Sequence, residues 1–179
     1  MKLYEYIWGF ARAYPLITIT STFIAFFLTN HIDLLIFSGV LLIADYFNHF
    51  LKNYIFKPIM GSNSWSIFGS GKRPDGAKNT GLFKDGSCSK SYGMPSGHAQ
   101  NAVFFSTYVI LNLVDNKETI LVKYFGIVLF IYLAVFIMYS RVYLRCHTVQ
   151  QVIVGGLIGA ILGTLYYKNK DTIKNLIIM

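Results

Sequence analysis

The chain has 179 residues, of which 54% are hydrophobic and 13% carry a formal charge. An average soluble domain carries about 25% charged residues, so this composition argues against both a disordered chain and an ordinary soluble protein. The net charge of +8 favours partners that carry phosphate, and the two cysteines imply no disulfide framework.

Residues 1–14 have apolar side chains at helical spacing and predict a short helix at the membrane surface, with a disordered start as the alternative. Five apolar stretches follow, each near the roughly 20 residues that a helix needs to cross a bilayer. They cover residues 13–32, 34–51, 95–114, 124–140 and 148–167. Because backbone groups in lipid must be paired within their own segment, we expect an all-α integral membrane bundle of about five transmembrane helices, forming a single membrane-embedded domain over residues 1–179.

A long polar loop, predicted over residues 53–95, separates the second and third spans. Its part from 61 to 93 holds 7 of the 15 glycines. Loops of this length in small proteins are more often functional than incidental. In the fifth span, Gly155, Gly159 and Gly163 form a stripe of small residues, which we expect to pack against another helix of the same chain rather than in a dimer interface.

Alternate crossing of the membrane places several polar clusters on one face. The ends of the second and fourth spans, the starts of the third and fifth spans and the long loop all lie there, with 11 of the 16 Lys and Arg residues. Such convergence is what an anionic ligand site requires. Nucleic acid is not expected as a partner, because the basic residues are scattered over span ends and no recognition fold is visible.

The end of the second span offers two lysines, Lys52 and Lys57. Taken singly, each is more typical of an anchor at the membrane surface than of a ligand. Asp45, His49 and Lys52 share one helix face, either as functional ionisable groups or as an ion pair that neutralises Lys52. In the loop, Arg73 is a further candidate phosphate ligand.

The sequence Pro95-Ser96-Gly97-His98 opens the third span. Proline is common where helices begin, and Gly97 leaves the backbone open to close approach. The free N–H groups of the first helical turn form an anion site, to which the Ser96 hydroxyl adds a donor. His98 then stands beside a bound phosphate, where it can give a proton to a leaving oxygen. The alternative is a helix start with a histidine of no special role.

The segment from Arg141 to Gln151 joins the fourth and fifth spans. Arg141 offers a planar fork for phosphate oxygens. His147 and Gln151 are four positions apart and share a helix face. The Gln carbonyl can accept the hydrogen on Nδ1 of His147, which leaves Nε2 as a nucleophile or base. The alternative is that His147 is only a polar residue at the membrane surface.

Together, a lysine, Arg-Pro at 73–74, Pro-Ser-Gly-His at 95–98 and Ser-Arg-x5-His at 140–147 resemble the type 2 phosphatidic acid phosphatase and haloperoxidase superfamily, over roughly residues 45–160. The resemblance implies an all-helical membrane phosphatase without metal or other cofactor. It implies that His147 is the nucleophile and forms a phosphohistidine, and that His98 protonates the leaving group. The implied phosphate cradle consists of Arg73, Ser96, Gly97, Arg141 and either Lys52 or Lys57.

Two features depart from the usual pattern of this family. The lysine usually stands seven positions before the Arg-Pro pair, whereas Lys57 precedes Arg73 by 16 positions and Lys52 by 21, so an insertion separates them. We favour Lys52. Most members carry Asp where this chain has Gln151, and a neutral amide stabilises the imidazolium less. Residues 92–100 and 141–152 nevertheless resemble dolichyldiphosphatases, which also have Gln there, and this shifts the expected substrate to a polyprenyl diphosphate. The family usually has six spans, one more than expected here.

We therefore expect a metal-independent membrane phosphatase that hydrolyses the terminal phosphate of a polyprenyl, dolichyl-like diphosphate, with membrane lipids around it. The alternatives are a broad lipid phosphomonoesterase of the phosphatidic acid type, a lipid phosphotransferase, and a non-catalytic protein that binds phospholipid. The positive-inside tendency would put the motif face in the cytoplasm. The resemblance implies the lumenal face of the endoplasmic reticulum or an equivalent membrane, and we favour that orientation.

Overall fold

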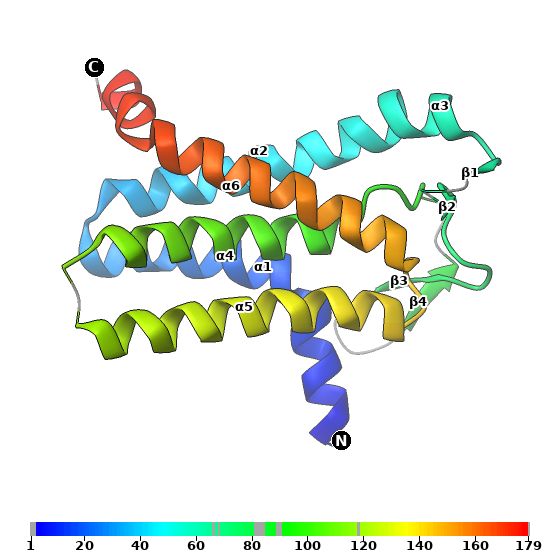
Figure 1. The fold of residues 1–179 in the computed structure, drawn as a ribbon, viewed down its shortest axis with the longest axis horizontal. Helices are drawn as coiled ribbons and strands as arrows, with labels where there is room; N and C mark the ends of the chain where they lie inside the picture. Colours follow the sequence, from blue (N-terminus) through cyan, green and yellow to red (C-terminus); the bar gives the residue numbers. More distant parts are fainter. Residues whose placement is uncertain are drawn as a thin grey trace.

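The computed structural model describes residues 3–65, 67, 69–80, 85–88, 91–117 and 119–178. It contains five long helices, which lie alongside one another for much of their length (Figure 1). They are α1 (Leu3–Thr29), α2 (Ile32–Phe50), α4 (Gly97–Asp115), α5 (Ile120–Tyr143) and α6 (Val149–Ile178). The predicted all-α bundle is confirmed, and of the five helices expected to cross the membrane, four are long and apolar enough to do so within the described residues.

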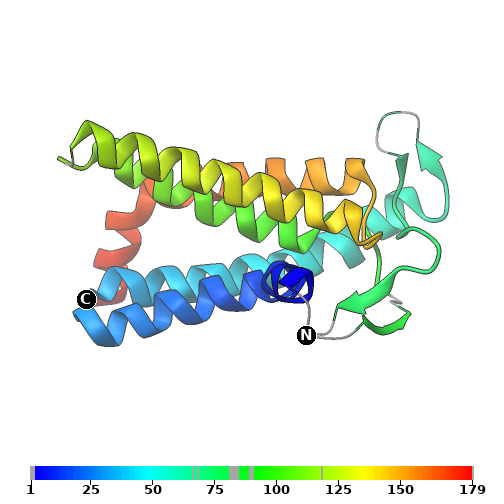
Figure 2. The same cartoon turned by 90° about the horizontal axis from the view of Figure 1, so that it is seen from below.

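The segment predicted as a loop over 53–95 is helical in its first part. From α2 the chain continues through a π-helical turn (Leu51–Phe56) into the short α3 (Lys57–Met60). Two small antiparallel hairpins follow, β1 (Ser64–Trp65) with β2 (Gly69–Ser70), and β3 (Lys78–Thr80) with β4 (Asp85–Cys88). Both lie at one end of the bundle (Figure 2).

Four helical segments are long and apolar enough to cross a membrane: Tyr4–Thr29, Ile32–Met60, Ile120–Tyr143 and Val149–Ile178. The protein is thus a multi-pass membrane protein by helix length and composition. The exception is α4, which contacts α1, α2, α5 and α6 and is the central helix of the bundle. Its polar side chains Gln100, Asn101 and Ser106 are buried among these neighbours. A helix lined by protein does not need the apolar surface that lipid demands, which explains its lower apolarity.

The glycine stripe on α6 packs against α4 within the chain, as predicted. A Cβ atom added at Gly155 would overlap the backbone of Ser96, and one at Gly159 would overlap the backbone of Gln100. Only glycine allows this close approach of the two helix backbones. As a result, the start of α4 is held next to the start of α6.

A polar network joins α2 to the same part of α4. Asn48 Nδ2 donates to Gln100 Oε1 at 2.8 Å, and Gln100 Nε2 donates to the carbonyl oxygen of Ala44 at 2.7 Å. All three groups are buried. Because unpaired amides are costly in an apolar environment, this network fixes the end of α2 beside the start of α4.

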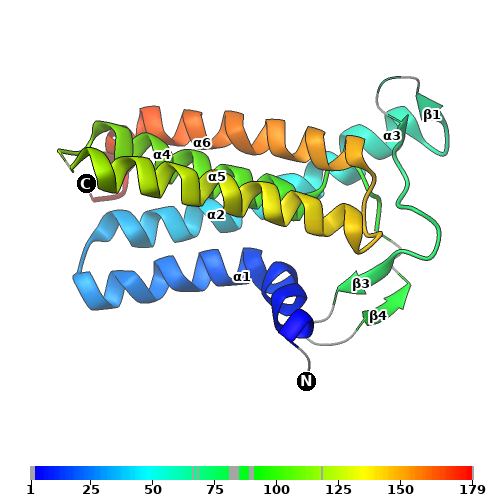
Figure 3. The ribbon, with the colours of Figure 1, turned by 60° about the horizontal axis from the view of Figure 1, so that its bottom comes forward.

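Helix α1 is bent, and its N-terminal turns (dark blue) run steeply to the other helices in the half of the bundle nearer the hairpins (Figures 1 and 3). Pro15 lies inside α1, lacks an N–H donor and crowds the preceding turn, which bends a helix. Ala11 and Tyr14, just before the proline, are buried against Ala102 and Ile137. The described part of the predicted N-terminal helix is therefore helical, and its place at the membrane surface stays a prediction.

Candidate active site

A cavity of about 320 Å³ opens at the end of the bundle where α2 ends and α4 and α6 begin. Its wall residues come from five parts of the fold: α1, the end of α2 with the π-helical turn, the loop before α4, the start of α4 and the turn before α6. The wall residues that carry charge or can transfer a proton include Arg12, Asp45, His49, Lys52, Arg73, His98 and His147. Five of the site residues predicted from the sequence therefore line the cavity: Lys52, Arg73, Gly97, His98 and His147.

His147 lies in the turn before α6 and is 3% exposed. Its Nδ1 is 2.9 Å from Gln151 Oε1, so the hydrogen bond expected from their spacing is present. Gln151 Nε2 donates to the carbonyl oxygens of Ser70 and Lys72, at 2.9 and 2.7 Å. Because both donors face carbonyl oxygens, the amide oxygen must accept the hydrogen of Nδ1. Nε2 of His147 is then the ring nitrogen with the lone pair.

The electrostatic surroundings keep His147 neutral. Burial lowers the pKa of His147 well below its usual value, and the positive charges of Arg73 and Lys52 lower that pKa further. The hydrogen bond that His147 donates to Gln151 raises the pKa and is the smaller effect. A neutral imidazole with a bare Nε2 is the form that can attack phosphorus or accept a proton.

Two arginines stand close to His147. Arg73 Nη1 donates to the carbonyl oxygen of Cys146 at 3.3 Å, which ties the loop to the residue next to His147. Arg141, in the last turn of α5, is 1% exposed, and its carbonyl oxygen accepts from the N–H of His147. Within the described part of the chain, Nε of Arg73 and Nε and Nη1 of Arg141 are buried without a hydrogen-bond partner. Buried guanidinium donors are normally hydrogen-bonded, and a phosphate offers several oxygens that can accept from both arginines.

The start of α4 adds backbone donors. Ser96 is the N-cap, its hydroxyl makes no capping hydrogen bond, and its Oγ is buried without a partner among the described residues. Its own N–H donates to the carbonyl oxygen of Gln151 at 3.0 Å. Gly97 follows at the cavity wall, where the first N–H groups of a helix are free to bind an anion.

His98 lines the same cavity and is anchored by α1. Its Nε2 is 3.0 Å from the carbonyl oxygen of Arg12. Since a carbonyl can only accept, Nε2 carries the hydrogen, and Nδ1 is the nitrogen that remains to exchange a proton. Burial, and after it the positive charge of Arg141, lowers the pKa of His98 to about 3, so both histidines are neutral before an anion binds. Each has one ring nitrogen available, and such a pair can carry out nucleophilic and acid–base chemistry.

The structure separates the two candidate lysines. Lys52 is 6% exposed and lines the cavity, whereas Lys57 is exposed and is not part of the wall. Lys52 lies in the π-helical turn, a local irregularity that often occurs at functional sites. Asp45 forms its ion pair with His49, at 4.0 Å, rather than with Lys52.

Arg12 is the charged residue among the described wall residues that the sequence interpretation did not select. It precedes the first span, and its only sequence signal is that the topology puts it on the motif face. Its carbonyl oxygen bonds to His98, and its charge acts on Arg141. Tertiary packing of the bent α1 places it there, and no local motif encodes that packing.

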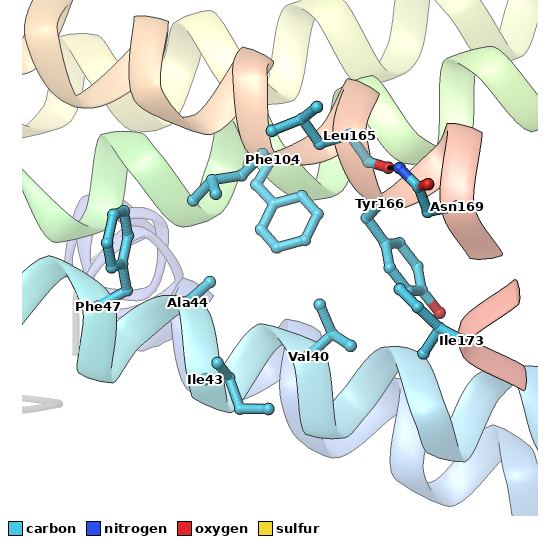
Figure 4. A pocket seen from close by; sticks show the side chains of 10 residues that line it. Val40, Ile43, Ala44, Phe47, Phe104, Leu165, Tyr166, Asn169 and Ile173 are labelled. Atoms are coloured by element: carbon cyan, nitrogen blue, oxygen red, sulfur yellow. Dashed lines mark hydrogen bonds between the residues drawn. The ribbon is translucent and has the colours of Figure 1, made fainter. Parts of the chain in front are cut away.

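A larger apolar groove of about 480 Å³ lies between α2, α4 and α6 (Figure 4). Val40, Phe47, Phe104 and Leu165 are among its lining residues. Its lining, within the part of the chain that the structure describes, holds no charged residue and no histidine, whereas the smaller cavity holds both. Among the described residues, no group of three or more His, Cys, Asp or Glu side chains is placed to hold a metal ion.

Comparison with known proteins gives a consistent result. The family model described as "PAP2 superfamily" matches residues 33–174. The chain is 29% identical over 144 residues to a dolichyldiphosphatase of Saccharomyces cerevisiae, covering 79% of this chain and 54% of that protein. It is 32% identical over 139 residues to dolichyldiphosphatase 1 of Homo sapiens, covering 73% and 50%. It is 40% identical over 84 residues to lipid phosphate phosphatase gamma of Arabidopsis thaliana, covering 43% and 35%. The chain spans about half the length of the dolichyldiphosphatases from yeast and human that it matches. No solved structure matches it.

Proposed function

Since the chain belongs to the PAP2 superfamily, we propose that it is a membrane lipid phosphatase that removes the terminal phosphate of a polyprenyl, dolichyl-like diphosphate. The observation that carries the proposal is the neutral His147, with Nε2 bare, in a cavity walled by Lys52, Arg73 and His98. Similarity to dolichyldiphosphatases over 73–79% of the chain favours the diphosphate substrate.

In this mechanism Nε2 of His147 attacks the terminal phosphorus in line with the bridging oxygen. A P–N bond forms, the bond from phosphorus to the bridging oxygen breaks, and its electron pair stays on that oxygen. The negative charge of the bound substrate favours the protonated form of His98, which donates the proton of its Nδ1 to the same oxygen, so the lipid monophosphate leaves. Lys52, Arg73 and Arg141, with the N–H groups at the start of α4, stabilise charge on the other phosphate oxygens. These groups supply the stabilisation that a metal ion supplies elsewhere.

Water completes the cycle. It attacks the phosphohistidine, His98 accepts its proton, and the P–N bond breaks to release inorganic phosphate and neutral His147. Gln151 holds the imidazole throughout by accepting the hydrogen of Nδ1. The amide also stabilises the imidazolium, less than a carboxylate would.

The decisive experiment compares wild type with His147→Ala on a polyprenyl diphosphate and on phosphatidic acid, with and without EDTA. We expect phosphate release from the diphosphate that persists in EDTA and disappears in His147→Ala. Preference for phosphatidic acid would favour a broad lipid phosphate phosphatase, a function that the Arabidopsis relative makes the second candidate. Radiolabel that moves to a new lipid would indicate a phosphotransferase. Equal behaviour of both proteins would refute the mechanism.

We also propose that the cavity faces the lumen of the endoplasmic reticulum or an equivalent membrane. Lys57 is exposed at the cavity end of the bundle, and Lys117 is exposed at the opposite end. In sealed vesicles of known orientation, an impermeant thiol reagent should label Lys57→Cys from the lumenal side and Lys117→Cys from the cytoplasmic side. The reverse pattern would place the cavity in the cytoplasm.

A further inference from the structure

Arg12 brings to the cavity a positive charge that lies outside the region of family similarity. That region is residues 33–174, whereas Arg12 lies on α1. The side chain is half-buried and lines the cavity together with Lys52, Arg73 and both histidines. Arg12, Lys52 and Arg73 thus place three positively charged residues along one cavity wall, and a wall of this composition attracts an anion.

The fold holds Arg12 firmly in this position. Its neighbours Ala11 and Tyr14 are buried against α4 and α5, and its own carbonyl oxygen accepts from His98 Nε2. Pro15, three residues later, bends α1 so that these turns run steeply to the other helices. The backbone at residue 12 is therefore fixed by packing on one side and by the bond to His98 on the other, and Arg12 lines the cavity from this position.

The two ends of the cavity differ in what they can bind. Arg73 is tied to Cys146, next to His147, so its charge stands at the end where phosphorus is attacked. The backbone carbonyl oxygen of Arg12 is bonded to His98 and Arg12 lines the cavity, so residue 12 stands at the end where the leaving oxygen is protonated. The group beyond His98 is the leaving group. When the substrate is a lipid diphosphate, that leaving group is itself a phosphate.

We infer that Arg12 binds the phosphate that stays on the lipid, and that it is a specificity-determining residue for diphosphates over monophosphates. This inference rests on the proposed function. A monophosphate has no second phosphate to place beyond His98, so its turnover depends on Lys52 and Arg73 but little on Arg12. Leu16 continues the cavity wall from Arg12 and is 57% exposed, so the retained phosphate leads to an apolar exit for the lipid chain.

The test compares farnesyl diphosphate with farnesyl monophosphate, which share one lipid chain. Variants are Arg12→Gln and Arg12→Lys, with Lys57→Gln as the matched control, because Lys57 lies outside the cavity wall and its loss also removes one positive charge. Loss of charge-assisted hydrogen bonds to the second phosphate should lower kcat/KM for the diphosphate about 10–100-fold in Arg12→Gln. The monophosphate should change less than about 3-fold, and Lys57→Gln should leave both unchanged.

Arg12→Lys keeps the charge but loses the planar fork, so it should show a smaller loss that is still confined to the diphosphate. If Arg12→Gln does not fold, as judged by its melting temperature in detergent, this second variant decides the question. Equal losses on both substrates would overturn the inference and leave the proposed function standing. A wild-type protein that hydrolyses neither lipid, or whose turnover survives His147→Ala, would overturn the proposed function itself.

Discussion

Replacing Gln151 by glutamate tests whether its amide nitrogen, and not only its oxygen, organises the site. The side chain is fully buried, and its Nε2 donates to the carbonyl oxygens of Ser70 and Lys72 while Oε1 accepts from His147. Gln151→Glu keeps the length of the side chain and the acceptor for His147. It removes both donors, so two carbonyl oxygens then face a buried carboxylate.

The cost can be worked out from these two bonds. A buried polar group left unpaired costs about 1–3 kcal/mol. Leaving the carbonyl oxygens of Ser70 and Lys72 unpaired therefore weakens the attachment of the loop to α6 by roughly 2–6 kcal/mol. The opposing effect is attraction between the new carboxylate and the imidazolium that forms on His147, about 1.5–3 kcal/mol for a charged hydrogen bond. Arg73 directly follows Lys72, so release of the loop also displaces a cation from the cavity. The middles of the two ranges leave a net cost of about 2 kcal/mol, so we expect a loss of activity of roughly 10–30-fold, since tenfold is about 1.4 kcal/mol.

Steady-state kinetics on farnesyl diphosphate and limited proteolysis of the loop around Lys72 measure the two consequences. Gln150→Glu is the matched control, because Gln150 is the exposed neighbour of the buried Gln151. We expect Gln151→Glu to lose activity and to expose the loop to protease, and Gln150→Glu to resemble wild type. Wild-type activity together with wild-type protease resistance in Gln151→Glu would refute the role of the amide.

Three further predictions concern single features of the site and the bundle. In the same phosphate-release assay, Lys52→Met should lower kcat/KM about 10–100-fold, because the charged contact of Lys52 with the phosphate is lost. Lys57→Met should lower it less than about 2-fold. A larger loss in Lys57→Met would assign the phosphate contact to Lys57. Because the pKa of His147 is lowered, phosphohistidine formation should persist as the pH falls below 6.5 and decline only at lower pH. Arg73→Gln removes one cause of that shift, so a rapid-quench pH profile should show the decline at higher pH, and an unchanged profile would argue against the charge effect. Gly159→Val should lower the free energy of unfolding by about 1–3 kcal/mol or more through overlap with the backbone of Gln100, whereas Leu157→Val, on an exposed position of α6, should be close to neutral in thermal unfolding.

The parts of the site that follow from local spacing were predictable. His147 and Gln151 lie one helical turn apart, so their hydrogen bond follows from helix geometry alone. The glycine stripe on α6 likewise indicated a close helix contact without naming its partner. Lys52 and Arg73 converge because alternate crossing of the membrane puts both on one face, and this requires only a count of spans.

The parts that depend on tertiary packing were not predictable. Arg12 reaches the cavity because Pro15 bends α1 steeply to the other helices, and no pattern in residues 1–14 encodes that position. The two carbonyl oxygens that hold Gln151 belong to a loop without periodicity. The length of the stretch without charged residues predicted that α4 is a membrane span. It did not show that α4 is the polar helix at the centre of the bundle. A hydropathy pattern describes the average surroundings of a segment, not which protein surface covers it.

The neutral Gln151 and the additional Arg12 have a common physical consequence. Most members of the family carry a carboxylate beside the nucleophile, which compensates part of the positive charge at the site. Here the carbonyl oxygens of Ser70 and Lys72 require an amide at that position, so the carboxylate is absent. The cations then depend on the substrate for compensation. A monophosphate carries about −1.5 to −2 charge at neutral pH, and a diphosphate carries more. In the proposed mechanism the more highly charged head group supplies the compensation that Asp supplies in other members, so the substitution of Asp by Gln favours a diphosphate substrate over a monophosphate.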